Sequence, residues 1–150
     1  TPERGDAAVL RQCALNLLAR REHSPLELRH KLTQRGFDPD RVDVLLSELQ
    51  DQDLLNETRY AEVYAHARVD RGYGPLRIKS ELLERGVSPA VVKRVLGQLE
   101  EIWMAKLSQV QRKRFGASRP YDAAAQAQQT RFLRYRGFTL EQISQLFRNG

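Results

Sequence analysis

Hydrophobic residues recur along this chain at the spacing of an α-helix, and the helices that they mark are short. Two stretches show the pattern most clearly, with apolar side chains three or four positions apart: Val42, Leu45, Leu46 and Leu49, and Val92, Val95, Leu96 and Leu99. Residues at this spacing fall on one face of a helix. Strand-favouring residues are sparse, whereas Leu, Ala, Arg, Gln and Glu dominate. The sequence therefore predicts an all-α protein.

The two stretches belong to a repeat with a period of fifty residues. The segment PLELRHKLTQRGFDPDRVDVLLSEL (25–49) matches PLRIKSELLERGVSPAVVKRVLGQL (75–99) at nine of 25 positions without a gap. A weaker third copy, RFLRYRGFTLEQISQLF (131–147), is offset from the first by 101 residues. One unit of this size could barely cover its own apolar faces, so we expect neighbouring units to stack.

Each copy predicts a helix, a tight turn and a second helix. A glycine ends the first helix, in the left-handed conformation that glycine adopts most readily: Gly36, Gly86 and Gly137. In the first two copies a capping residue and a proline begin the second helix: Asp38-Pro39 and Ser88-Pro89.

A further helix precedes each pair. Its apolar stripe is predicted from Leu10, Cys13, Ala14, Leu17 and Leu18 in the first unit, from Tyr60, Val63, Tyr64 and Ala67 in the second, and from Trp103, Leu107 and Val110 in the third. The expected architecture is an elongated array of three tandem three-helix repeats, about nine helices in all, with units at 1–54, 55–100 and 101–150 forming a single structural unit. An elongated array offers one long face to a partner.

The net charge of +6 is unevenly distributed. Residues 1–102 hold 16 basic and 17 acidic side chains, whereas residues 103–150 hold 9 basic and 2 acidic ones. Of the 25 basic residues 20 are Arg, the side chain suited to bidentate contacts with carboxylates and phosphates. This imbalance indicates a polyanion or an acidic protein surface as partner, and charge alone does not distinguish the two.

The turn GYGP at residues 72–75 has two interpretations. Gly74-Pro75 begins a helix, but that role does not explain Tyr73 or the basic residues around it: Arg68, Arg71, Arg77 and Lys79. Arg68 and Arg71 lie in the last turn of one helix, where the helix dipole favours them, whereas Arg77 and Lys79 lie in the first turns of the next, where it does not. The cluster is either a binding surface or solvated surface with Tyr73 packed on the turn.

Residues 71–86, RGYGPLRIKSELLERG, resemble the signature of the RecX family, the regulators that bind RecA recombinase filaments. Three further blocks are similar to the same family, and together they extend the resemblance over residues 8–148: HSPLELRHKL (23–32), NETRYAEVYAHAR (56–68) and RFLRYRGFTLEQI (131–143). Leu140 departs from the pattern, because it replaces the proline of the earlier repeats.

The resemblance implies a non-enzymatic protein of three helical repeats that binds recombinase filaments on DNA. Such a protein inhibits filament extension, ATP hydrolysis and strand exchange, and so modulates recombinational DNA repair and the SOS response. The implied partners are a RecA-type recombinase filament and, weakly and without sequence preference, single- or double-stranded DNA. We expect a cytoplasmic monomer that binds no membrane. The candidate contacts are Arg59, Arg68, Arg71, Tyr73, Arg77, Lys79, Arg131, Arg134 and Arg136.

Alternatives stand beside this interpretation. The Arg-Gly-x-x-Pro turn superficially resembles a helix-turn-helix, which would make the chain a direct DNA-binding module. The helices that follow, 39–51 and 89–99, carry mixed charge, which argues against it. Phe132 and Tyr135 could pack in the core, and the arginine before each turn glycine could cap the end of a helix: Arg35, Arg85 and Arg136.

Catalytic signals are missing from the sequence. There is no phosphate-binding Gly-x-x-x-x-Gly-Lys-Ser/Thr loop, and the three histidines are isolated, without the spacing of a metal site. Cys13 lies on an apolar stripe, which predicts a buried thiol. No apolar run approaches the ~18 residues of a membrane span, and no signal peptide is evident. We expect no enzymatic activity, no cofactor and no metal.

Overall fold

The computed structural model describes residues 2–117 and 120–149. Within these ranges every regular element is helical, which confirms the predicted fold class. The helices are α1 (Pro2–Arg20), α2 (Pro25–Gln34), α3 (Pro39–Asp51), α4 (Glu57–Asp70), α5 (Pro75–Glu84), α6 (Pro89–Gln98), a 3-10 turn (Glu100–Ile102), α7 (Trp103–Phe115), α8 (Ala123–Tyr135) and α9 (Leu140–Asn149).

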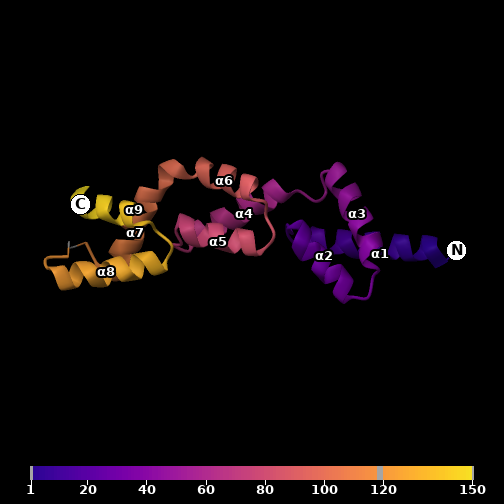
Figure 1. Ribbon diagram of the computed structural model, residues 1–150, viewed down its shortest axis with the longest axis horizontal. Helices are drawn as coiled ribbons and strands as arrows, with labels where there is room; N and C mark the ends of the chain where they lie inside the picture. Colours follow the sequence, from indigo (N-terminus) through magenta and orange to yellow (C-terminus); the bar gives the residue numbers. More distant parts are fainter. Residues whose placement is uncertain (1, 118–119, 150) are drawn as a thin grey trace.

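The molecule is elongated, with its two termini at opposite ends (Figure 1). The helices follow one another along the long axis in three groups: α1–α3, α4–α6 and α7–α9. The predicted boundary at 54/55 falls in the connection between α3 and α4, and the one at 100/101 falls within the 3-10 turn.

Local chemistry explains where the helices begin and end. The Asp38 side chain accepts a hydrogen bond from the Arg41 amide at the start of α3, and Ser24 and Glu27 form a reciprocal capping box at the start of α2. The three turn glycines have positive φ, as predicted: 94° at Gly36, 84° at Gly86 and 105° at Gly137.

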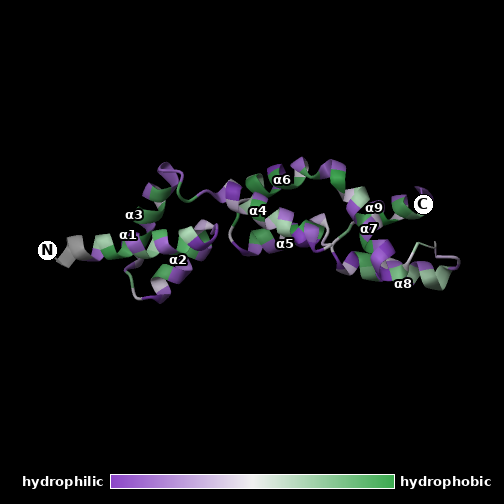
Figure 2. Cartoon of the chain, turned by 180° about the vertical axis from the view of Figure 1, so that it is seen from behind, coloured by the Kyte–Doolittle hydropathy of each residue, from purple (hydrophilic) through white to green (hydrophobic). Residues whose placement is uncertain are grey.

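The apolar core has two parts. Hydrophobic residues, green in Figure 2, occur on the helices of both parts. One belongs to α1–α3, and the other is shared by α4–α9, so the second and third units are packed more intimately than the first and second. Trp103 and Phe138, the largest fully buried side chains, lie in the shared core.

Two predictions about buried residues need correction. In α4 the buried face consists of Tyr60, Ala61, Ala65 and Val69, whereas Val63, at 55%, and Ala67 are exposed. Alanines leave the phase of an apolar stripe ambiguous, and here they mark the inner face. Cys13 is only half-buried, because it lies at the edge of its core, where Arg35 Nη1 approaches the sulfur to 2.8 Å.

The units are joined by a contact that occurs twice. The start of the second helix in one unit docks on the Arg-Gly turn of the next unit. Ser24 Oγ donates to the Arg85 carbonyl at 2.8 Å, and the Gly74 amide donates to the Arg136 carbonyl at 2.8 Å. Gly36, on the turn of the first unit, has no neighbour within 4 Å of the position that a Cβ would take.

Candidate functional site

Tyr73 lies on the turn between α4 and α5, surrounded by three guanidinium groups. Gly72 ends α4 with φ 89°, and Pro75 begins α5. The guanidinium carbons lie 3.9 Å (Arg68), 4.4 Å (Arg77) and 4.9 Å (Arg136) from the centre of the Tyr73 ring. These distances are typical of cation–π contacts. We call Tyr73, these three arginines and Glu81 the Tyr73 cluster.

Glu81 holds this cluster together. Arg68 donates two parallel hydrogen bonds to its carboxylate at 2.9 and 2.8 Å, and the Tyr64 hydroxyl donates a third at 3.0 Å. Arg77 Nε lies 3.5 Å from the same carboxylate. Burial opposes the charged form of Glu81, but the hydrogen bonds from Arg68 and Tyr64 outweigh it and lower the pKa of the carboxyl group.

The three arginines are not equivalent. The Arg68 side chain is 18% exposed, its charge is paired with Glu81, and its guanidinium group lies against the Tyr73 ring. Arg77 extends to the third unit, where it donates to the Tyr135 carbonyl at 3.3 Å and lies 5.2 Å from the Tyr135 ring. Tyr135 itself is 71% exposed. The accessible part of the surface therefore spans the second and third units.

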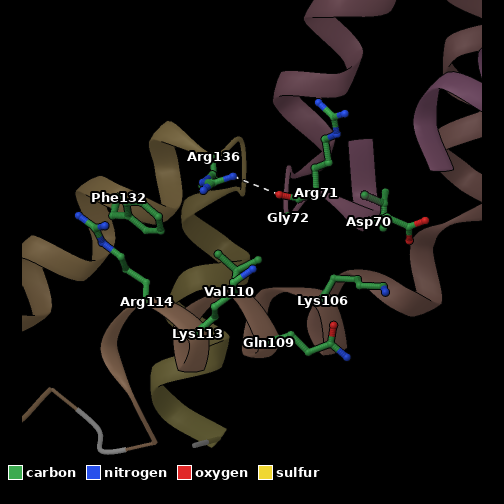
Figure 3. Close-up of a pocket in the computed structure, with 11 residues that line it drawn as sticks. Asp70, Arg71, Gly72, Lys106, Gln109, Val110, Lys113, Arg114, Phe132 and Arg136 are labelled. Atoms are coloured by element: carbon green, nitrogen blue, oxygen red, sulfur yellow. Dashed lines mark hydrogen bonds between the residues drawn. The ribbon is translucent and has the colours of Figure 1, made fainter. Parts of the chain in front are cut away.

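Arg136 links the Tyr73 cluster to a neighbouring cleft. Its Nη1 donates to the Arg71 carbonyl, at the end of α4, at 3.2 Å (Figure 3). The cleft has a volume of about 430 Å³ and lies between the end of α4 and helices α7 and α8. We call it the basic cleft, after the cations that line it: Arg71, Lys106, Lys113, Arg114 and Arg136.

The structure brings together some of the predicted contact residues and separates others. Arg68, Tyr73, Arg77 and Arg136 form the Tyr73 cluster, and Arg71 is exposed beside it. The other four lie apart from the Tyr73 ring: Arg59, Lys79, Arg131 and Arg134.

Each of these four has its own surroundings. Arg59 is paired with Glu22 and Asp53. Lys79 lines a separate groove, and Arg131 and Arg134 are exposed on α8, the helix that also carries Tyr135.

Sequence reasoning missed Glu81 and the α7 cations Lys106, Lys113 and Arg114. Glu81 lies four positions after Arg77, a spacing at which opposite charges meet on a helix, so that signal was available. The cations of α7 lie where the net positive charge of the sequence begins, but their shared face became visible only once α7 was placed beside α4 and α8.

The capping alternative is confirmed for two of the three turn arginines. Arg85 Nη1 donates to the Glu81 carbonyl in the last turn of its own helix, and Arg136 caps α4 through the Arg71 carbonyl. Arg35 instead contacts Cys13.

The core-packing alternative holds for one of the two aromatic residues. Phe132 is half-buried and packs edge-to-face on Phe115, with ring centres 5.5 Å apart. Tyr135 is exposed.

Across residues 2–117 and 120–149, no group of three or more His, Cys, Asp or Glu side chains could hold a metal ion. No helix in the same ranges is long and apolar enough to cross a membrane.

Comparison with known proteins gives consistent matches. The model of the first three-helix domain of RecX matches residues 11–49, and the model of the second matches residues 56–96. The regulatory protein RecX of Halorhodospira halophila (strain DSM 244 / SL1) is 46% identical over 135 residues, which are 90% of this chain and 84% of the relative. That of Pseudomonas entomophila (strain L48) is 43% identical over 138 residues, 92% of this chain and 89% of the relative. The crystal structure of RecX from Lactobacillus salivarius shares the fold, with a TM-score of 0.84 at 22% identity over 97% of both chains.

Proposed function

The chain belongs to the RecX family of regulatory proteins, not to a family of enzymes, and we propose that it regulates a RecA-type recombinase. In this proposal it binds the recombinase filament on DNA in the cytoplasm, as a monomer. It inhibits filament extension, ATP hydrolysis and strand exchange, and thereby modulates recombinational repair and the SOS response.

One observation carries the proposal. The family-like stretch RGYGPLRIKSELLERG builds the Tyr73 cluster, in which Tyr73 and Arg77 meet Tyr135 and Arg136 of the third unit. A cationic and aromatic surface of this kind suits contact with an acidic protein surface.

The elongated shape supports a polymeric partner. The three units extend along one axis (Figure 1), so different units can touch different protomers of one filament. Contacts that are individually weak are then multiplied, because every contact after the first is intramolecular. DNA binding in this proposal is weak, lacks sequence preference and falls steeply with salt.

The helix-turn-helix alternative has less support. The helices that would have to read DNA are α3 and α6. α3 carries Arg41 among four carboxylates, and α6 carries only Lys93 and Arg94 as charged groups. A recognition helix needs a basic and polar face for base edges and phosphates.

Recombinase ATPase activity on single-stranded DNA tests the proposal. The wild-type chain is expected to inhibit it. The triple variant Arg77→Ala/Arg131→Ala/Arg134→Ala removes three cations from the proposed contact surface and is expected to raise the half-inhibitory concentration at least tenfold. The matched triple variant Arg20→Ala/Arg94→Ala/Arg148→Ala removes the same charge from exposed positions on α1, α6 and α9 and should inhibit like the wild type. Equal inhibition by both triple variants would contradict the role of Arg77, Arg131 and Arg134 in binding, and absence of inhibition by the wild type would contradict the function.

A further inference from the structure

The charges of the basic cleft are not explained by the Tyr73 cluster. Five cations line it and Asp70 is the one carboxylate among its lining residues. In residues 2–117 and 120–149 none of the five cations forms a salt bridge, whereas six other arginines of the described residues do. Gathering like charges without counter-charges is unfavourable, and a cleft lined by one sign of charge attracts the opposite sign.

The cations are spread along the cleft rather than gathered at one point. On α7 they extend from Lys106 to Arg114, which is about 12 Å of helix at 1.5 Å per residue. Arg136 adds charge from the end of α8, whereas Arg71 lines the cleft at the end of α4 with its guanidinium group directed away from the α7 cations (Figure 3). A single anionic group would meet only part of this row. A nucleic-acid strand, with about 3.4 Å between phosphates along the axis, would present three or four charges over the same length.

The cleft also has an aromatic wall. Phe132 lines it, and the guanidinium groups of Arg114 and Arg136 lie 4.9 and 5.3 Å from the centre of the Phe132 ring. Figure 3 shows Arg114 and Arg136 beside this ring, with Lys113 and Val110 below. Flat aromatic and guanidinium groups next to a cationic groove are the features by which proteins hold single strands, because unpaired bases stack on them. A duplex keeps its bases stacked inside and cannot use such a wall.

We propose that the basic cleft binds a single strand of nucleic acid, with the phosphates along the α7 cations and a base against the Phe132 wall. This deepens the proposed function and rests on it for the source of the strand, which is the DNA that the recombinase coats. Two separate surfaces of the molecule would then bind the two partners. The Tyr73 cluster contacts protein, and the basic cleft, joined to the cluster through Arg136, contacts the strand.

Binding of a fluorescein-labelled oligothymidylate of about 15 nucleotides, within the range of single-strand site sizes, tests the inference by fluorescence anisotropy. The double variant Lys106→Ala/Lys113→Ala is expected to bind at least fivefold more weakly than the wild type. The slope of log K against log salt should fall in magnitude by about 1.4, because each lost phosphate contact removes about 0.7. The matched variant Arg20→Ala/Arg94→Ala should keep the wild-type slope, and circular dichroism should show unchanged helicity in both.

Three results would overturn the inference. Equal weakening by both double variants would mean that net charge alone attracts the strand. Tighter binding of a duplex of the same length would exclude the aromatic wall as a base platform. Polyglutamate of equal length that binds as tightly as the oligothymidylate, with the same loss in the lysine variant, would assign the cleft to an acidic polypeptide. The assay contains no recombinase, so its result is independent of whether the chain inhibits one.

Discussion

Leu26 of the first unit covers Gly86 of the second so closely that a Cβ at Gly86 would lie 2.6 Å from the Leu26 Cβ. A similar contact occurs one unit further on, where a Cβ at Gly137 would lie 2.4 Å from the Cβ of Arg77, one position after the repeat equivalent of Leu26. Glycine is therefore needed at both turns for two reasons, namely the positive φ and the close approach of the neighbouring unit.

Comparison of Gly36 with Gly86 distinguishes the two effects, because both have positive φ but only Gly86 is covered by a neighbouring unit. Gly36→Ala should lower the free energy of unfolding by about 1 kcal/mol, because it meets only the cost of a left-handed alanine. Gly86→Ala should lower it by about 2–4 kcal/mol, because the Leu26 side chain and its backbone must also move. Urea denaturation followed by circular dichroism measures both values. Equal losses would show that the junction between the first two units tolerates displacement.

Glu81 is predicted to be a structural centre of the Tyr73 cluster. Glu81→Ala leaves the half-buried Arg68 without its carboxylate and should cost about 2–3 kcal/mol of unfolding free energy. Glu84→Ala, an exposed carboxylate on the same helix, is the control and should change it by less than about 0.5 kcal/mol. If the two variants unfolded alike, Glu81 would not hold the cluster.

Glu27 is predicted to make the free energy of unfolding depend on pH in the acidic range. Burial raises its pKa, but hydrogen bonds from Arg21 and from the Ser24 amide outweigh this and lower the pKa from 4.5 to about 2. A carboxyl group whose pKa is depressed in the folded state stabilises the fold above its unfolded pKa, and that stabilisation is lost as the pH falls toward the folded pKa.

The wild type should therefore lose about 2 kcal/mol more than Glu27→Gln between pH 5 and about pH 2, measured by urea denaturation at each pH. Glu27→Gln keeps a side-chain oxygen for the capping box but cannot titrate. Parallel pH profiles for the two proteins would rule out Glu27 as a source of acid sensitivity.

The repeat made most of the fold predictable. Turn glycines, capping residues and prolines recur at fixed positions, and each acts through its immediate neighbours, so Asp38 and Gly86 could be interpreted without knowledge of the tertiary structure. The sequence did not predict which face of α4 is buried, because that face is built partly from alanines, whose hydrophobicity is weak.

The candidate site was only partly predictable for a different reason. The turn at 72–75 drew attention to Tyr73, and two of the four basic residues predicted around it, Arg68 and Arg77, contact the ring. Arg136, the third arginine on the ring, comes from the third unit and was not predicted there. Which charges are neutralised depends on partners in other parts of the fold. Arg68 is paired through Glu81 on α5, and Arg59 through Glu22, 37 positions earlier. The basic cleft depends on α7 lying beside α4, which no local pattern specifies.

Co-sedimentation with recombinase tests the central claim most directly, namely that the exposed face of this array binds an assembled filament. Purified recombinase is mixed with the chain with and without single-stranded DNA and nucleotide, so that filaments form in only one sample. The account predicts that the chain pellets with the filaments and not with unassembled recombinase, and that the Arg77→Ala/Arg131→Ala/Arg134→Ala variant stays largely in the supernatant. A chain that remains in the supernatant in both samples, or a variant that pellets as fully as the wild type, would contradict it.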